Sequence, residues 1–235
     1  NDTQSLFIRG KIDRIDLLET EKGYHLGIVD YKSSAQKFDI NRLRYGIQLQ
    51  LLTYLSVARN IVSVQFNKAV TPYGGLYMHV FQPSFNAKDI KADADFEETR
   101  LKKYKLSGLL TNDLGVLQQV QPDFETGDSI VLPFGVKKDG EYKATSQVYA
   151  PDDINLLMDF AFYQLKTAGE RILNGENQIA PFDELKEYAD SVNGKFSAIA
   201  MFDATNPENN YQFLTKMPLQ ENLTWMREKL NGKEA

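Results

Sequence analysis

The sequence predicts an α/β fold in which helices flank a mixed central sheet. Apolar and polar residues alternate along 7–18 and again along 24–30, as they do in strands. Apolar residues recur three and four positions apart along 39–59 and 151–174, as they do in amphipathic helices. Further helical and strand segments extend this core toward the C-terminus, and we expect residues 1–235 to form a single domain.

The composition suits a globular protein with a substantial core. Of the 235 residues, 42% are hydrophobic and 25% are charged, which shows no bias toward disorder. No apolar run approaches the roughly 20 residues that span a bilayer, and no signal-peptide pattern opens the chain. The absence of cysteine excludes disulfides and thiolate metal sites, which fits a cytoplasmic protein. The start at Asn1, without Met and directly before a strand, suggests a fragment of a larger subunit.

The formal net charge of −5 argues against strong binding to nucleic acid, because such binding comes from Lys and Arg neutralising phosphates. Two local clusters are basic, although each is more often only a solvated face: Lys32, Lys37, Arg42 and Arg44, and then Arg100, Lys102, Lys103 and Lys105. If the chain acts on DNA, we expect weak affinity on its own and delivery of the strand by a larger assembly.

The first two strands bring acidic residues together. Residues 6–8 and 10–18 read as strand, and the polar stretch 19–23 ends in Gly and can close a hairpin with 24–30. Side chains alternate between the faces of a strand, so Asp30 and Lys32 point the same way. Pairing of the two strands would bring Asp13 close to Asp30.

The helix predicted over 39–59 begins at Asp39, a plausible N-cap. Its apolar stripe comprises Ile40, Leu43, Ile47, Leu51, Tyr54 and Ala58. Gln50 falls on or beside this stripe, and an inward glutamine needs a partner. That partner is either a strand end, in a purely structural hydrogen bond, or the site formed by the hairpin, and we favour the site. Tyr54 either packs mainly in the core or reaches the site with its hydroxyl.

Shorter patterns follow. Residues 62–66 and 75–81 read as strands around a loop at 71–75, and the only two histidines, His25 and His79, fall in strands, where they are usually structural. The remaining pattern predicts helices over 91–104, 114–120, 151–174 and 223–230, a strand over 129–134, a Lys-Asp-Gly turn at 138–140 and a helix stop at Gly175. There is no internal repeat and no phosphate-cradling glycine loop, so we expect no ATP hydrolysis by this chain.

Asp13, Asp30 and Lys32 together favour metal-dependent hydrolysis. Carboxylate oxygens suit a hard cation such as Mg²⁺, which takes one or two protein carboxylates and keeps several waters. Such a cation activates water at a phosphodiester, and a lysine helps to neutralise the transition state. Asp-Tyr-Lys at a strand end is by itself usually a solvated terminus, so the argument depends on the combination. Asp16 is a weaker candidate, since it lies on the opposite strand face and more readily pairs with Arg14.

The combination resembles a known family. The matching blocks are Gly10-Lys11-Ile12-Asp13-Arg14-Ile15-Asp16, Ile28-Val29-Asp30-Tyr31-Lys32-Ser33-Ser34 and Tyr45 to Tyr54, which carries Gln50 and Tyr54 in a Gln-x-x-x-Tyr pattern. They resemble the RecB-type branch of the PD-(D/E)xK nucleases, which have a restriction-endonuclease-like core. More closely, they resemble the C-terminal nuclease domain of the B subunit (AddB or RexB type) of the AddAB and RexAB helicase–nucleases.

This resemblance implies roles and partners. Asp13 and Asp30 would be metal ligands, Lys32 the catalytic lysine, and Gln50 and Tyr54 the motif that follows. The metal would be Mg²⁺, with Mn²⁺ as a substitute. The substrate would be DNA unwound by a heterodimer with an A subunit of the AddA or RexA type, in double-strand break repair and recombination.

The sequence departs from the family in two places. Many B subunits hold an iron–sulfur cluster through cysteines, but the matching positions here are Ser191, Gly194 and Ala200, followed by Phe202-Asp203. Such clusters are held by thiolates, so we expect none in this chain. The metal-binding histidine that relatives often carry upstream of the first aspartate has no counterpart before Asp13, so we expect that it either lies on a preceding part of the protein or is absent from this branch of the family.

Two alternatives stay open. The chain could be a catalytically inactive nuclease-fold module that guides DNA or docks a partner subunit, although the complete set of motif residues argues against decay. It could also be an unrelated α/β domain, in which case Asp13 and Asp30 would not converge.

Overall fold

The computed structural model describes residues 5–21, 23–81, 96–178, 180–182, 201–203, 205–206 and 209–232. Contacts divide the chain into two compact units. Unit 1 comprises Asn1–Phe7, Asp39–Ile47 and Phe162–Ala235, and unit 2 comprises Ile8–Phe38 and Gln48–Ala161. The prediction of a single domain therefore stays a prediction, and each unit is described by itself.

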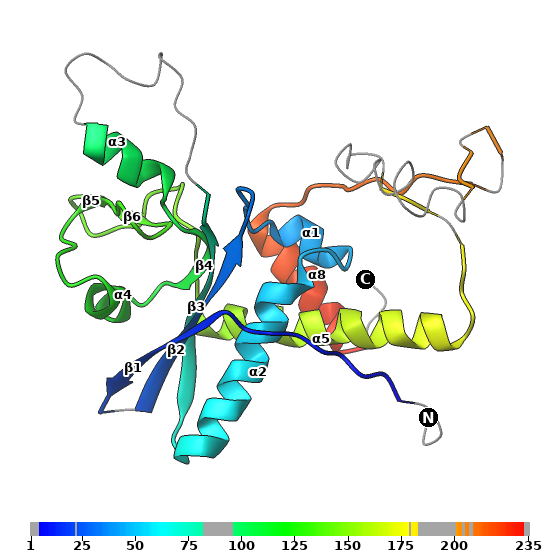
Figure 1. Ribbon diagram of the computed structural model, residues 1–235, viewed down its shortest axis with the longest axis horizontal. Helices are drawn as coiled ribbons and strands as arrows, with labels where there is room; N and C mark the ends of the chain where they lie inside the picture. Colours follow the sequence, from blue (N-terminus) through cyan, green and yellow to red (C-terminus); the bar gives the residue numbers. More distant parts are fainter. Residues whose placement is uncertain are drawn as a thin grey trace. The chain divides into compact units, whose positions relative to one another are not determined.

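Unit 2 is built on a mixed five-stranded sheet, which confirms the predicted α/β class (Figure 1). Its order is β1 (Arg14–Thr20), β2 (Gly23–Lys32), β3 (Val70–His79), β4 (Ser107–Thr111) and β7 (Val148–Tyr149). β1 pairs with β2 and β3 with β4 antiparallel, whereas β2 pairs with β3 and β4 with β7 parallel. The buried centre of the sheet is β2 and β3, which carry the longest apolar stretches.

The predicted N-terminal hairpin is confirmed, but its first strand is shorter than expected. β1 begins at Arg14, and the strand predicted over 6–8 is wrong because residues 5–13 form no regular element. The turn ends at Gly23, whose φ of 124° and close approach to the carbonyl of Ala69 suit glycine. Thr20 Oγ1 also donates a 3.0 Å hydrogen bond to the Gly23 carbonyl.

The single helix predicted over 39–59 is wrong: it is two helices, α1 (Ile40–Arg44) and α2 (Leu49–Phe66). Asp39 caps α1 as expected, accepting a 2.9 Å hydrogen bond from the Asn41 backbone. The break follows from two left-handed residues, Gly46 at φ 76° and Gln48 at φ 63°, which a continuous helix cannot contain.

The strand predicted over 62–66 is also wrong, because α2 continues to Phe66 and ends at Asn67, another left-handed residue. Val62 is buried on the same helical face as Leu55 and Ala58, so packing on the sheet overrides the strand preference of β-branched residues. The predicted loop at 71–75 is instead part of β3. Gly75 lets α2 approach there, since an added Cβ would lie 2.9 Å from Leu51 Cγ.

Different elements cover the two faces of the sheet (Figure 1). α2 packs on β2 and β3, burying Leu51, Leu52 and Leu55 on the face that also carries Leu26 and Ile28. The other face meets α4 (Leu114–Val120) and the small sheet of β5 (Gly127–Asp128) and β6 (Gly135–Val136). The core there contains Val29, Tyr73, Leu76, Leu117 and Phe134. β2 therefore has core on both faces.

The strand predicted over 129–134 is wrong for a local reason. The buried Ser129 hydroxyl accepts hydrogen bonds from the Leu132 and Val131 backbones, at 2.8 and 3.2 Å, and so closes a turn. The predicted Lys-Asp-Gly turn is confirmed, with Gly140 at φ 87°.

The other predicted helices are confirmed as α3 (Phe96–Lys103), α4, α5 (Pro151–Leu173) and α8 (Leu219–Leu230). Residues 91–95 of the predicted 91–104 helix lie outside the described residues. α5 contributes Pro151–Ala161 to unit 2 and its remainder to unit 1, and Gly175 follows it at φ 77°. No helix in the described parts of the chain combines the length and apolar character that crossing a bilayer requires.

Candidate active site

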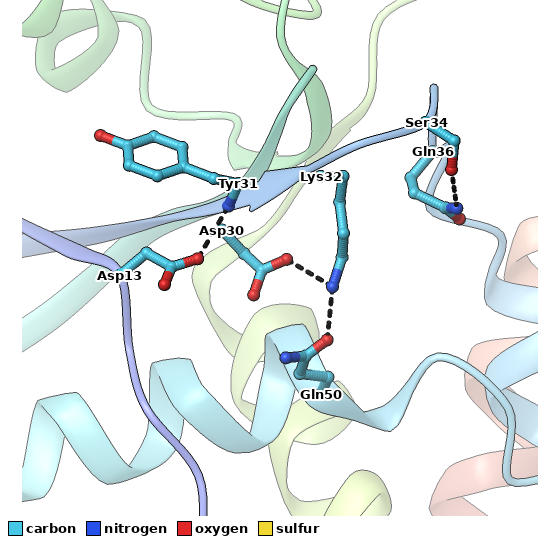
Figure 2. Close-up of polar contacts among 7 residues, drawn as sticks. All are labelled: Asp13, Asp30, Tyr31, Lys32, Ser34, Gln36 and Gln50. Atoms are coloured by element: carbon cyan, nitrogen blue, oxygen red, sulfur yellow. Dashed lines mark hydrogen bonds and ion pairs between the residues drawn. The ribbon is translucent and has the colours of Figure 1, made fainter. Parts of the chain in front are cut away.

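The β1–β2 hairpin positions both predicted carboxylates. Arg14 pairs with Val29 in the antiparallel register, which places Asp13 beside Asp30 at the end of the ladder. Asp13 Oδ2 accepts a 3.0 Å hydrogen bond from the Tyr31 backbone amide. Figure 2 shows the two carboxylates side by side. The structure therefore contradicts the alternative in which Asp13 and Asp30 do not converge.

Asp30 and Lys32 point to the same side of β2, as strand alternation predicted (Figure 2). Asp30 is only 3% exposed, and its Oδ2 lies 2.6 Å from Lys32 Nζ. This contact is an ion pair without hydrogen-bond geometry, since within the described parts of the chain the same buried Oδ2 accepts no hydrogen bond. The lone pairs of this oxygen can therefore bind a further cation. An ordinary structural carboxylate would have used them in hydrogen bonds.

Gln50 reaches the same group from the first turn of α2. Its Oε1 accepts a 2.7 Å hydrogen bond from Lys32 Nζ. The prediction that Gln50 faces inward is wrong, because the helix begins at Leu49 rather than Asp39 and Gln50 is exposed. Of its two predicted partners, the structure shows the lysine of the candidate site. Lys32 is thereby held between a carboxylate and an amide oxygen.

Tyr54 lies one turn further along α2 and contacts the segment that leads to Asp13. Its ring is half-buried against Gly10, where an added Cβ would lie 2.7 Å from both Tyr54 Cε1 and Oη. Glycine at this position therefore lets the chain cross the tyrosine closely. Tyr54 packs against the segment that leads to Asp13, so the contact that the structure shows is with another part of the same protein.

The remaining candidates lie outside this group. Asp16 is on the opposite strand face, as expected, and its Oδ1 pairs with Arg14 Nε at 2.7 Å. His79 Nε2 lies 3.1 Å from the carbonyl of Ser33, and His25 pairs with Leu18 in the hairpin register. Among the described residues, no cluster of three or more His, Cys, Asp or Glu side chains could hold a metal.

The residues present fit a hard divalent cation held by Asp13 and Asp30. Mg²⁺ takes only one or two protein carboxylates and keeps several waters, so a third side chain is not required. The buried Asp30 Oδ2 that accepts no hydrogen bond is the observation that supports this fit. The residues that replace the family's cysteines, Ser191, Gly194 and Ala200, lie outside the described residues.

Sequence reasoning did not identify one further contributor, the Tyr31 backbone amide, which orients Asp13. Counting the register back from the turn would have predicted it. Gly10 was part of the first matching block, but its contact with Tyr54 could not be predicted, because it depends on where α2 crosses the chain.

Comparison with known proteins identifies the family. Residues 2–184 match the model of the PD-(D/E)XK nuclease superfamily. The chain is 33% identical over 225 residues to the B subunit of the ATP-dependent helicase/deoxyribonuclease of Bacillus thuringiensis (strain Al Hakam). It is 32% identical over 225 residues to the protein of the same name from Bacillus cereus (strain G9842). Each match covers 95% of this chain and 19% of the relative, so the chain spans about a fifth of their length. The hairpin carboxylates, the adjacent lysine and these matches agree that the chain belongs to the PD-(D/E)XK nuclease superfamily.

Proposed function

We propose that this chain is a Mg²⁺-dependent deoxyribonuclease domain of a cytoplasmic helicase–nuclease that acts in double-strand break repair and recombination. The observation that carries the proposal is the buried Asp30 carboxylate, ion-paired to Lys32 beside Asp13 and with one oxygen that accepts no hydrogen bond. Burying a carboxylate is costly unless it is paired and hydrogen-bonded. An incompletely satisfied carboxylate in a nuclease fold is best explained by chemistry.

Asp13 and Asp30 would hold the divalent cation. When bound, Mg²⁺ supplies a Lewis acid for the phosphoryl oxygen and lowers the pKa of a coordinated water. Asp13 is oriented for this role by the Tyr31 amide, and Asp30 is fixed by its place in the sheet between β1 and β3.

Lys32 would place positive charge where negative charge develops on the phosphodiester. Its ammonium is held between Asp30 Oδ2 at 2.6 Å and Gln50 Oε1 at 2.7 Å, so it is preorganised for that role. Gln50 would act by positioning the lysine. Tyr54 would act by packing the segment that carries Asp13.

The partners follow from the relatives' name and from the charge. The relatives are named as B subunits of an ATP-dependent helicase/deoxyribonuclease, and we propose that this chain works with an A-type helicase subunit as a heterodimer on DNA. The net charge of −5 disfavours strong DNA binding by this chain alone, so the assembly would deliver the unwound strand.

Cleavage of a 5′-labelled DNA strand by the intact protein in Mg²⁺ or Mn²⁺ tests the proposal. We expect Asp30→Asn and Lys32→Met to lower the rate at least about 10²- to 10³-fold, as does the loss of a preorganised charged group in other active sites. Glu19→Gln is the matched control, because this exposed carboxylate on the same hairpin pairs with Lys68 and should leave cleavage unchanged. Undiminished cleavage by both site variants would disprove the assignment.

The inactive-module alternative makes a different prediction. It requires no cleavage by the unaltered protein in either metal and no dependence of DNA binding on Asp30. Calorimetric titration with Mn²⁺ separates the two hypotheses further, because only the nuclease predicts a binding isotherm that disappears in the Asp13→Asn, Asp30→Asn double variant.

A further inference from the structure

A second feature lies on the other face of the strand that carries the site. A cleft of about 420 Å³ opens there, within the range of pockets that bind small organic groups. Its walls are mainly apolar and include Val29, Met78, Tyr104, Leu106 and Leu132, with the Arg14–Asp16 pair among its few polar groups. All of these residues belong to unit 2.

The cleft and the candidate active site share the β1–β2 hairpin. Arg14 directly follows Asp13, and Val29 directly precedes Asp30. One residue of a strand spans about 3.3 Å, so residues lining the cleft begin one residue away from both carboxylates. Because successive side chains point to opposite faces, the cleft lies behind the sheet edge at which Asp13 and Asp30 meet.

Tyr31 connects the two features. It lies between Asp30 and Lys32, its amide binds Asp13, and its side chain is 43% exposed. Figure 2 shows its ring pointing away from Lys32 and Gln50. Strand alternation places Tyr31 on the same face of β2 as Val29. The side chain of Arg14 interacts with Asp16 and with the Tyr31 hydroxyl, and both raise the pKa of Arg14, Asp16 more strongly.

The chemistry of this surface suits an aromatic heterocycle. Bases stack on tyrosine rings and on guanidinium planes, and such stacking tolerates any base because every base has a π-face. Cationic residues in the last turn of α3, Arg100, Lys102 and Lys103, flank the cleft residues Leu101 and Tyr104. A strand that inserts a base here would find positive charge for its phosphates.

We propose that this cleft takes one unstacked base of the strand being cut, next to the scissile phosphate, with Arg14 in its wall and Tyr31 beside Arg14. The inference rests on the proposed nuclease function and adds a positioning subsite to it. Holding one base behind the sheet edge would fix the neighbouring phosphodiester at Asp13 and Asp30. It would also restrict the substrate to single strands, because a base within a duplex is stacked and paired.

Single abasic substitutions, moved along a fluorescent single-stranded oligonucleotide, test the subsite. Binding to the intact protein is measured by anisotropy with Ca²⁺ in place of Mg²⁺. We expect one position at which loss of the base weakens binding about tenfold, the typical effect of removing one stacking contact. Leu101→Trp, which fills the cleft from a 45% exposed position, should abolish that positional effect.

Matched variants isolate the cleft. Ile61→Trp introduces the same ring at a 53% exposed site on α2 and should keep the unaltered abasic profile. Tyr31→Phe should keep it too, whereas Tyr31→Ala should flatten it, because stacking needs the ring and not the hydroxyl. Circular dichroism and the midpoint of thermal unfolding show that each variant is folded.

The outcomes separate this inference from the proposed function. A flat abasic profile in an unaltered protein that still cleaves DNA overturns the subsite alone. A profile that Leu101→Trp leaves intact also overturns it. If the unaltered protein neither binds nor cuts single-stranded DNA, both the subsite and the nuclease assignment fail.

Discussion

Asp30 in unit 2 and Arg44 in unit 1 are both charged side chains withdrawn from water, at 3% and 6% exposure. Asp30 lies against one cation, Lys32, and its Oδ2 accepts no hydrogen bond. Arg44 Nη2 instead donates to the Thr215 carbonyl, to the Thr215 hydroxyl at 3.0 Å and to the Tyr45 hydroxyl at 3.2 Å. Its Nη1, like Asp30 Oδ2, has no hydrogen-bond partner within the described residues. Its guanidinium also lies 4.9 Å from the ring centroid of Tyr45 and 5.8 Å from that of Trp225.

The two charges differ in their surroundings: Asp30 lies beside Lys32 and Asp13, whereas Arg44 lies among neutral acceptors and aromatic rings. We infer that Asp30 is buried for chemistry and Arg44 for structure. Arg44 joins α1 to the segment before α8 through neutral acceptors and ring faces, and among the described residues it forms no ion pair. The Arg44 guanidinium therefore stabilises the packing of α1 against the segment before α8 and has no other evident role. Asp30 is arranged so that a further cation could satisfy it, at some cost to the unliganded fold.

The largest effect on stability should come from Arg44. We expect Arg44→Leu to lower the free energy of unfolding of unit 1 by about 2–4 kcal/mol, because it strands the Thr215 and Tyr45 groups. Arg44→Lys should recover little, since an ammonium lacks the planar fork that reaches several acceptors. Urea unfolding followed by the fluorescence of Trp225, the only tryptophan of the chain, measures this directly. An unchanged free energy of unfolding in Arg44→Leu would show that Arg44 is not a structural charge.

The buried hydroxyl of Tyr73 must stay neutral, so the pH dependence of stability tests a third buried group against Asp30 and Arg44. Burial raises the pKa of Tyr73 to about 12, against about 10 in an unfolded chain. The resulting stabilisation is complete below pH 10 and is lost as the pH rises from 10 to 12, because only the unfolded state then ionises freely. We expect Tyr73→Phe to match the parent chain near pH 8 and to exceed its stability by about 2–3 kcal/mol at pH 12. Urea unfolding across this pH range measures the difference, with Tyr31→Phe as an exposed control. If the idea is wrong, the free energies of unfolding of Tyr73→Phe and of the parent chain will decline in parallel.

Neutralising Asp30 should have a smaller effect on stability, and one of opposite sign to that of Arg44. We expect Asp30→Asn to leave the free energy of unfolding unchanged or to raise it by about 1 kcal/mol, because it removes a buried charge whose Oδ2 accepts no hydrogen bond within the described residues, while the partly exposed Lys32 keeps its hydrogen bond to Gln50. Hydrogen exchange at the amides of β2 and β3 measures the change within unit 2. A loss as large as that of Arg44→Leu would show that Asp30 is a structural charge after all.

The smallest effect should come from Gln50. We expect Gln50→Met to lower the rate of DNA cleavage about three- to tenfold, which corresponds to the net contribution of one typical hydrogen bond at an exposed position. Gln65→Met, at another exposed position of α2, is the matched control and should not change the rate. An equal rate in both variants would show that Lys32 is positioned by Asp30 alone.

Strand alternation and the turn sequence were sufficient to predict the hairpin, the shared face of Asp30 and Lys32, and the approach of Asp13, since these depend only on local register. The family resemblance, confirmed by comparison, came from the same blocks. The long helix α5 and the short helix α4 were predictable for the same local reason.

Tertiary structure decided what the local pattern left open. The left-handed turn at Gly46 and Gln48 splits the predicted helix and moves Gln50 to the exposed first turn of α2, where it meets Lys32. Packing against β2 and β3 turns 62–66 into helix. A residue's neighbours across the sheet, rather than its own propensity, determine these outcomes, because burial on a shared face contributes more free energy than local preference does.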